Sequence, residues 1–154
     1  MTASEPGLRG GEPTVVGAPV ESRDLPEAVR RAAQFALERK ALDVLALDLR
    51  GISSATDFFV IASGTSDVQV KAIAEHMVDE LKKIGARPDH VEGLQGGRWV
   101  LIDCIDFVVH VFHPQSRDFY QLEHLWGDAP RWEAPSSGAS EGAVRGQVGT
   151  SGRA

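Results

Sequence analysis

Four short, largely apolar runs constrain this fold more than any other feature of the sequence: residues 44–47, 58–62, 99–102 and 107–112. None approaches the ~20 apolar residues that cross a bilayer, but each has the length and the β-branched or aromatic content of a strand. The first two suit strands buried on both faces of a sheet. The last two lie close enough in sequence to form an antiparallel hairpin. We therefore expect a sheet at the centre of the domain.

A helix should precede the first run. Asp24 and Glu27, with Pro26 in the first turn, form a helix-start signal, and the helix should run to about Ala41. Its apolar residues recur with a period of about 3.6, the helical repeat. They are Val29, Ala32, Ala33, Ala36 and Leu37. A helix with such a stripe needs another element to pack against.

The second helix is the best-defined element of the sequence. Ser66 and Gln69 form a capping box at its start, and Gly85 stands where a left-handed C-cap belongs. Its apolar stripe consists of Val70, Ile73, Met77, Leu81 and Ile84. This pattern predicts a helix with one buried side.

The rest of the chain completes a domain of the α/β class. Residues 88–92 are typical of a weak edge strand, since Pro88 is tolerated at an edge and not in the centre of a sheet. A last helix should run from about Gln115 to Trp126 and end at Gly127. The order α-β-β-α-β-β-β-α predicts a mixed sheet of about five strands covered by helices.

The domain should span residues 24–130, between two disordered tails. Residues 1–23 and 131–154 are rich in Gly, Pro, Ser, Thr and Ala, and they cannot bury enough surface to offset the entropy of ordering. Each tail is nearly neutral, which leaves the formal net charge of −6 on the domain. An acidic domain disfavours direct nucleic-acid binding and favours a basic protein partner. With no secretory signal and no membrane span, we expect the chain to act in the cytoplasm.

No motif demands a cofactor, a metal ion or a catalytic role. The turn at 63–66 precedes a helix and offers N–H groups to a phosphate, but capping explains its serine, and P-loop and G-x-G-x-x-G patterns are absent. Asp103 and Asp106 are too few carboxylates for nucleotidyl transfer, and acids beside a hairpin turn are the simpler interpretation. His110 and His113 point to opposite faces of a strand. A Mg²⁺-dependent nucleotidyltransferase-like enzyme remains the alternative.

Aromatic and polar residues mark a candidate binding surface. Alternation places Trp99, Leu101 and Asp103 on one face of the strand that follows Gly97. On the last helix a polar stripe recurs with helical spacing and consists of Arg117, Tyr120, Gln121 and His124. A tyrosine-bearing stripe beside a tryptophan-bearing strand has the composition of an interface hot spot. Plain core packing is the alternative for Trp99.

Taken in order, these segments resemble the ribosome-silencing factor (Iojap-like) family. The similarity spans residues 24–130 and depends on the order and spacing of DFFVIASGTS at 57–66, VKAIA at 70–74, EG at 92–93, WVLID at 99–103, VVHVF at 108–112, RDFYQLE at 117–123 and LW at 125–126. The resemblance implies an α/β domain related to the nucleotidyltransferase fold but without its catalytic apparatus. It therefore implies a protein that is not an enzyme.

The resemblance also implies a partner. Family members bind the large ribosomal subunit through large-subunit protein fourteen, where the small subunit docks, and so repress translation in starvation or stationary phase; some assist large-subunit assembly. By match to the motifs, the contact residues would be Trp99, Asp106, His110, Arg117 and Tyr120, with Glu92 nearby. A homodimer of the free protein is expected, because an apolar docking face is often covered by a second copy. A small-ligand or assembly module linked only indirectly to the ribosome is a third interpretation.

The sequence departs from the family at Ile105, where glycine is usual in the turn between the paired strands. A β-branched residue disfavours positive φ, so we expect a turn of another type than the tight primed hairpin turn. The relative placement of Asp103 and Asp106 depends on that turn.

Overall fold

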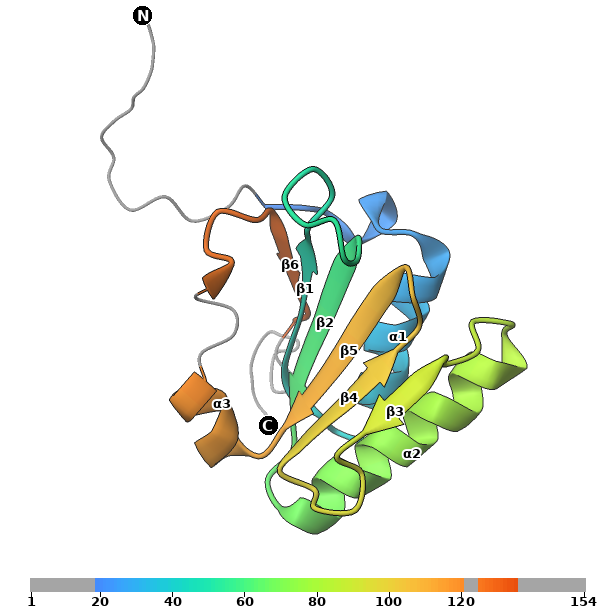
Figure 1. The fold of residues 1–154 in the computed structure, drawn as a ribbon, viewed down its shortest axis with the longest axis vertical. Coiled ribbons are helices and arrows are strands. Elements are labelled where there is room, and N and C mark those ends of the chain that lie inside the picture. The colour runs from blue at the N-terminus through green and yellow to red at the C-terminus, as the bar shows by residue number, and fades with distance from the viewer. Residues whose placement is uncertain (1–18, 121–124, 136–154) are drawn as a thin grey trace, which may run out of the picture.

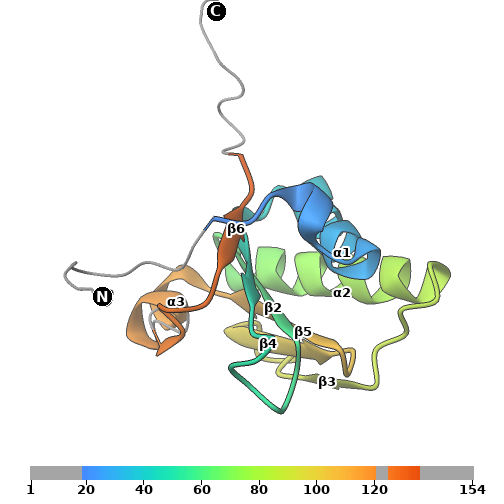
Figure 2. The same cartoon turned by 90° about the horizontal axis from the view of Figure 1, so that it is seen from above.

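The computed structural model describes residues 19–120 and 125–135, which form a six-stranded sheet with helices on both faces (Figures 1 and 2). In chain order the elements are η1 (Ser22–Asp24), α1 (Glu27–Glu38), β1 (Leu42–Asp48), β2 (Phe58–Ser63), α2 (Asp67–Lys83), β3 (His90–Glu92), β4 (Trp99–Asp103), β5 (Phe107–Phe112), α3 (Pro114–Tyr120) and β6 (Arg131–Glu133). The strands lie in the order β3-β4-β5-β2-β1-β6. Only β2 and β5 are parallel among the described pairs. The predicted mixed α/β class is confirmed.

The strand β6 corrects the predicted domain boundary. It pairs antiparallel with β1, and on its outer side the N–H of Val20 donates to the carbonyl oxygen of Arg131 (2.8 Å). The sheet therefore has one strand more than the about five predicted, and Arg131–Glu133, which the sequence assigned to a disordered tail, are part of it. A strand this short shows no periodicity in its sequence, and the sheet edge on which it pairs decides its conformation.

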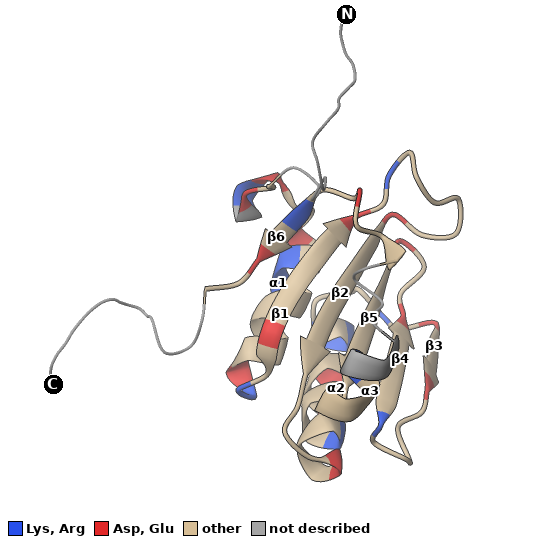
Figure 3. Ribbon diagram, turned by 90° about the vertical axis from the view of Figure 1, so that its left-hand side faces the viewer, with Lys and Arg blue, Asp and Glu red and all other residues tan. Residues whose placement is uncertain are grey.

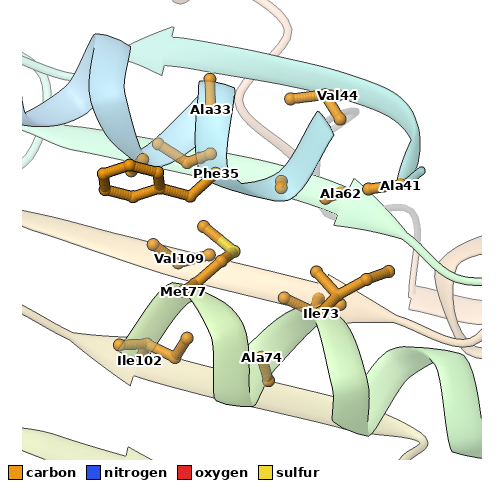
Figure 4. Packing of buried hydrophobic residues seen from close by; sticks show 14 of the residues in the cluster. Ala33, Phe35, Ala41, Val44, Ala62, Ile73, Ala74, Met77, Ile102 and Val109 are labelled. Atoms are coloured by element: carbon orange, nitrogen blue, oxygen red, sulfur yellow. The ribbon is translucent and has the colours of Figure 1, made fainter. Parts of the chain in front are cut away.

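Two helices form the main core with one face of the sheet. α1 and α2 lie side by side on that face, whereas α3 lies on the other (Figure 2). Figure 4 shows Ile73 and Met77 of α2 against Ile102 and Val109 of the sheet, with Phe35 of α1 beside them. The apolar stripes predicted for both helices face this core. None of the described helices is long and apolar enough to span a membrane.

The two helices of this layer start differently. At α2 the hydroxyl of Ser66 accepts a hydrogen bond from the N–H of Gln69 (3.1 Å), which confirms the predicted cap. At α1 the N-cap is Pro26 and no side-chain hydrogen bond caps the helix; Asp24 lies in η1, so the predicted start signal marks the place where the helix begins without acting as a side-chain cap. Gly85 follows α2 with φ +82°, the left-handed conformation expected of a C-cap glycine.

The β4–β5 turn is built around Ile105. Its φ is +72° and the N–H of Asp106 donates to the carbonyl oxygen of Cys104 (2.8 Å), which defines a γ-turn. The hydroxyl of Thr56 donates to the Ile105 carbonyl (3.1 Å), and the Asp103 carboxylate accepts from the Ile105 N–H (2.8 Å). The sequence predicted a turn other than the primed hairpin type, and the γ-turn is such a turn. However, Ile105 keeps the positive φ that its side chain disfavours, so the turn is strained.

Candidate protein-binding face

The sheet face opposite α1 and α2 carries a partly exposed apolar surface. We call it the open face, and it consists of the half-buried residues Phe59, Trp99, Leu101 and Val108. The strand register makes Val108 the neighbour of Phe59, and Leu101 the neighbour of His110. Figure 3 views this side of the sheet. Strands β2 and β5 carry no Lys, Arg, Asp or Glu, and the charged residues lie on the other strands, the helices and the loops.

Aromatic neighbours fix the position of Trp99. Its indole N–H donates to Nδ1 of His110 (3.0 Å), and its ring stacks on Phe112 with the centroids 5.1 Å apart. The ring of Phe59 meets the rings of His110 and Trp126 edge-on, with centroid separations of 4.5 Å and 6.1 Å. Such ring pairs contribute roughly 0.5–1.5 kcal/mol each beyond the area that they bury. Trp99 is thus partly core and partly surface.

His110 lies beneath the open face as a neutral ring. It is 4% exposed, and burial lowers its pKa to about 4. Because Nδ1 accepts the indole proton of Trp99, the imidazole proton resides on Nε2. Nε2 is buried and has no hydrogen-bond partner among the described residues. In this structure His110 therefore supports Trp99 from below and presents no charge at the surface.

Arg117 does not lie on the outer surface of α3. It is 8% exposed, and its Nη1 donates to the carbonyl oxygen of Asp43 (2.9 Å) and to the hydroxyl of Ser63 (2.8 Å). Asp43 has φ +50° and lies where the β1–β2 register shifts, so a β-bulge supplies one of these acceptors. The prediction that Arg117 belongs to a solvent-facing polar stripe is wrong. The buried guanidinium ties α3 to β1 and β2.

The other predicted contact residues lie apart from one another. Glu92 on the edge strand β3 pairs with Leu101, so it borders the open face. Asp106 is exposed in the β4–β5 turn, separated from His110 by roughly 13 Å of extended strand. Tyr120 is the last residue of α3, and its side chain lies outside the described part of the structure. The fold thus brings Glu92 to the open face and leaves Asp106 at the far end of the sheet.

Several of the groups considered for phosphate or metal binding are already engaged. In the 63–66 turn the N–H of Gly64 donates to a carbonyl of β5, and the N–H of Thr65 donates to the side chain of Gln69. The Asp103 carboxylate is bonded within its own turn. Across residues 19–120 and 125–135, no three His, Cys, Asp or Glu side chains gather to hold a metal ion. The nucleotidyltransferase-like alternative gains no support from this geometry.

A separate hollow of about 520 Å³ lies between the start of α1, the end of α2 and the β4–β5 turn. Cys104 lines it, and burial raises the pKa of its thiol to about 12, so the thiol stays protonated at neutral pH. Arg87, Asp57 and Asp106 also line this hollow; the N–H of Asp57 donates to the main-chain carbonyl of Asp106 (3.0 Å), and no ion pair joins Arg87 to either carboxylate among the described interactions. No chemistry is assembled there.

Two groups of residues in this region were not predicted from the sequence. Phe59 belongs to a run that suggested burial on both faces, and only the parallel pairing of β2 with β5 places it beside Val108 on the open face. Asp43 and Ser63 hold Arg117 through a main-chain and a hydroxyl oxygen. Neither acceptor has a sequence signature, because both depend on how α3 folds back over the sheet.

Comparison with known proteins identifies the family. The family model described as ribosomal silencing factor during starvation (RsfS) matches residues 22–150. This chain belongs to the ribosomal silencing factor family. It is 48% identical over 99 residues to the ribosomal silencing factor RsfS of Bacillus subtilis, covering 64% of this chain and 84% of that protein.

More distant relatives of this silencing-factor chain include a mouse protein named mitochondrial assembly of ribosomal large subunit protein 1. The two are 29% identical over 128 residues, which is 81% of this chain and 53% of the mouse protein. The names of these relatives describe ribosomal silencing and assembly of the ribosomal large subunit.

Crystal structures of related proteins share the fold of this silencing-factor chain. A Chromobacterium violaceum protein matches with a TM-score of 0.65 and 35% identity, over 76% of this chain and 92% of that one. A Bacillus halodurans protein matches with a TM-score of 0.61 and 42% identity, over 68% of this chain and 95% of that one. The suspected family resemblance is confirmed.

Proposed function

We propose that this chain is a ribosomal silencing factor that binds the large ribosomal subunit through large-subunit protein fourteen and blocks association with the small subunit. It acts in the cytoplasm and represses translation, for example in starvation or stationary phase. The observation that carries the proposal is the open face, an apolar surface on a rigid sheet within the segment matched by the family model. The mouse relative's name also favours a role in large-subunit biogenesis.

The open face has the properties of a binding hot spot. Trp99 is already held by Phe112 and His110, so it loses little side-chain freedom when a partner covers it. Leu101 and Val108 lie on the neighbouring strand positions and extend the apolar area around the indole. A preordered tryptophan surrounded by apolar side chains is the arrangement that yields most binding energy on desolvation.

Acidic residues border this apolar area. Glu92 lies on β3 beside the open face, and Asp103 ends β4. Asp57 and Asp106 are exposed at the same end of the sheet as Asp103. Figure 3 shows acidic residues on these outer strands and loops. Together with the net charge of −6, they favour encounter with a basic ribosomal protein and make the association rate fall as salt rises.

Steric exclusion requires no reacting group. A folded domain seated on the large subunit, at the surface where the small subunit docks, prevents that contact by occupying its volume. When no ribosome is present, the same open face is available to a second copy of the chain, so we propose that the free protein is a homodimer. Sedimentation of the purified chain should then give the mass of a dimer, and Leu101→Lys should shift it toward the monomer.

A matched pair of variants tests the proposed surface. Leu101→Lys places a charge on the open face, where a half-buried position lets a lysine reach solvent. Val68→Lys makes the same change on α2, at a position that is 77% exposed on the other side of the domain. We expect Leu101→Lys to reduce co-sedimentation with purified large subunits, and binding to isolated protein fourteen, by at least about tenfold. Val68→Lys should bind like the wild type.

The outcomes separate surface from mechanism. Equal binding by Leu101→Lys and the wild type, with both folded by circular dichroism, would show that the open face is not the contact. Wild-type protein that travels with assembled ribosomes as readily as with free large subunits would contradict steric exclusion, even if the contact surface is correct.

A further inference from the structure

A small cavity lies between α3 and the β1–β6 edge of the sheet, away from the open face. Its volume is about 270 Å³. Its walls are formed by Asp43, Val44, Leu45, Arg117, Arg131, Glu133 and Ala134. At ~30 Å³ for each water in the liquid, this space accommodates a group several times larger than a water molecule.

Arg131 forms one wall and has an unused donor. Its side chain is 19% exposed, and its Nη1 contacts a carboxylate oxygen of Glu133 at 3.3 Å. Its Nε is buried and has no hydrogen-bond partner among the described residues. A buried donor of a charged group without an acceptor is destabilising, so the site favours any ligand that supplies one.

The backbone around Arg131 is fixed on both sides. It pairs with Leu47 of β1, and its carbonyl oxygen accepts from the N–H of Val20. The second cation, Arg117, is fixed as well, because its Nη1 bonds to Asp43 and Ser63. Two guanidinium groups on rigid elements therefore line one cavity. Such preorganisation removes much of the entropic cost of holding an anion.

We propose that this cavity binds a single phosphate group, either inorganic phosphate or the phosphate of a small monoester. Once the Glu133 carboxylate moves away, the planar fork of Arg131 would donate through Nε and a terminal nitrogen to two phosphate oxygens, and Arg117, which also lines the cavity, would add its positive charge. Glu133 opposes the anion, but its side chain is 63% exposed and its contact with Arg131 is long. The phosphate displaces that carboxylate into solvent.

Three variants of the full chain, compared with the wild type, isolate this site. Arg131→Gln removes the guanidinium fork, and Glu133→Gln removes the competing negative charge. Arg87→Gln is the control: it also removes one positive charge, but at an exposed residue that lines the 520 Å³ hollow near the β4–β5 turn. Arg131→Lys keeps the charge without the fork and serves if Arg131→Gln is poorly folded. The ligands are inorganic phosphate and glycerol 2-phosphate, with chloride at matched ionic strength as the reference.

Backbone amide shifts of residues 131–134 report binding in ¹H–¹⁵N spectra. We expect saturable shifts in the wild type with a Kd on the order of 1 mM, which is ordinary for a small anion. The two Arg131 variants should bind at least about tenfold more weakly, Glu133→Gln more tightly, and Arg87→Gln like the wild type. Saturation by phosphate but not by the monoester assigns the site to the free ion. Linear shifts equal to those in chloride, or full binding by Arg131→Lys and Arg131→Gln, would overturn the proposal.

Discussion

Replacing Arg117 by alanine should destabilise the domain far more than a surface substitution does. The change removes at least two hydrogen bonds from a charged donor, to the Asp43 carbonyl at 2.9 Å and the Ser63 hydroxyl at 2.8 Å. Each such bond contributes roughly 1.5–3 kcal/mol, and both acceptors would be left without this donor. We therefore expect a loss of about 3–5 kcal/mol in the free energy of unfolding, a large fraction of the 5–15 kcal/mol that is typical of a domain.

Urea unfolding followed by circular dichroism measures this loss. Arg117→Lys keeps a cation that reaches fewer acceptors, so its stability should lie between those of the wild type and the alanine variant. Arg87→Ala is the matched control, because Arg87 is exposed and its loss should change the free energy of unfolding by less than about 0.5 kcal/mol.

The result also distinguishes the two roles considered for Arg117. If it ties α3 to the sheet, the alanine variant loses stability. If it is instead a surface contact, the variant keeps its urea midpoint and loses only affinity for the large subunit. A change below about 1 kcal/mol in the free energy of unfolding would show that Arg117 does not hold α3 against β1 and β2.

Burial of His110 makes the stability depend on pH. Its pKa is about 4 in the fold against 6.5 for an unperturbed histidine, so a contribution of about 3 kcal/mol to the free energy of unfolding is complete above pH 6.5 and lost as the pH falls toward 4. Urea unfolding across that range should show this loss of stability, and His110→Asn should make the free energy of unfolding depend less on pH. If the variant and the wild type lost equal stability as the pH falls, His110 would not be the group responsible. Gly93→Ala should lower the melting temperature and change tryptophan fluorescence, because a Cβ at Gly93, where φ is +81°, would overlap the carbonyl oxygen of Trp99; an unchanged melting temperature would argue against this close approach. Ile105→Gly should leave the protein about 1–2 kcal/mol more stable than Ile52→Gly, a control at an exposed position without positive φ, since only the first substitution relieves strain. Equal stabilities in urea would show that the γ-turn is not strained.

Local signals in the sequence were reliable where neighbouring residues decide the outcome. The serine at the start of α2 caps it as predicted, and the glycine at its end takes the left-handed conformation. The hairpin of β4 and β5 also followed from two apolar runs close together in the chain. In each case the partners lie within a few residues of each other, so sequence spacing fixes their geometry.

The candidate site was predictable only in part, and Trp99 and Arg117 show why. Alternation along β4 correctly gave the face on which Trp99 lies, because a strand has a period of two. The same reasoning on α3 placed Arg117 in solvent, because polarity was taken as the sign of exposure. A long cationic side chain can be buried when main-chain and hydroxyl oxygens receive it, and those acceptors come from β1 and β2, distant in sequence.

By itself, the sequence determined the class of the domain, its main strands and helices, its acidic charge and its resemblance to a family, since all of these follow from composition, short-range spacing or the order of motifs. Only the tertiary structure decided the strand order, the addition of β6, the burial of Arg117 and the extent of the open face. The physical reason is that strand pairing and burial are set by contacts between segments far apart in the chain. The free energy of such contacts leaves no periodic trace in any one segment.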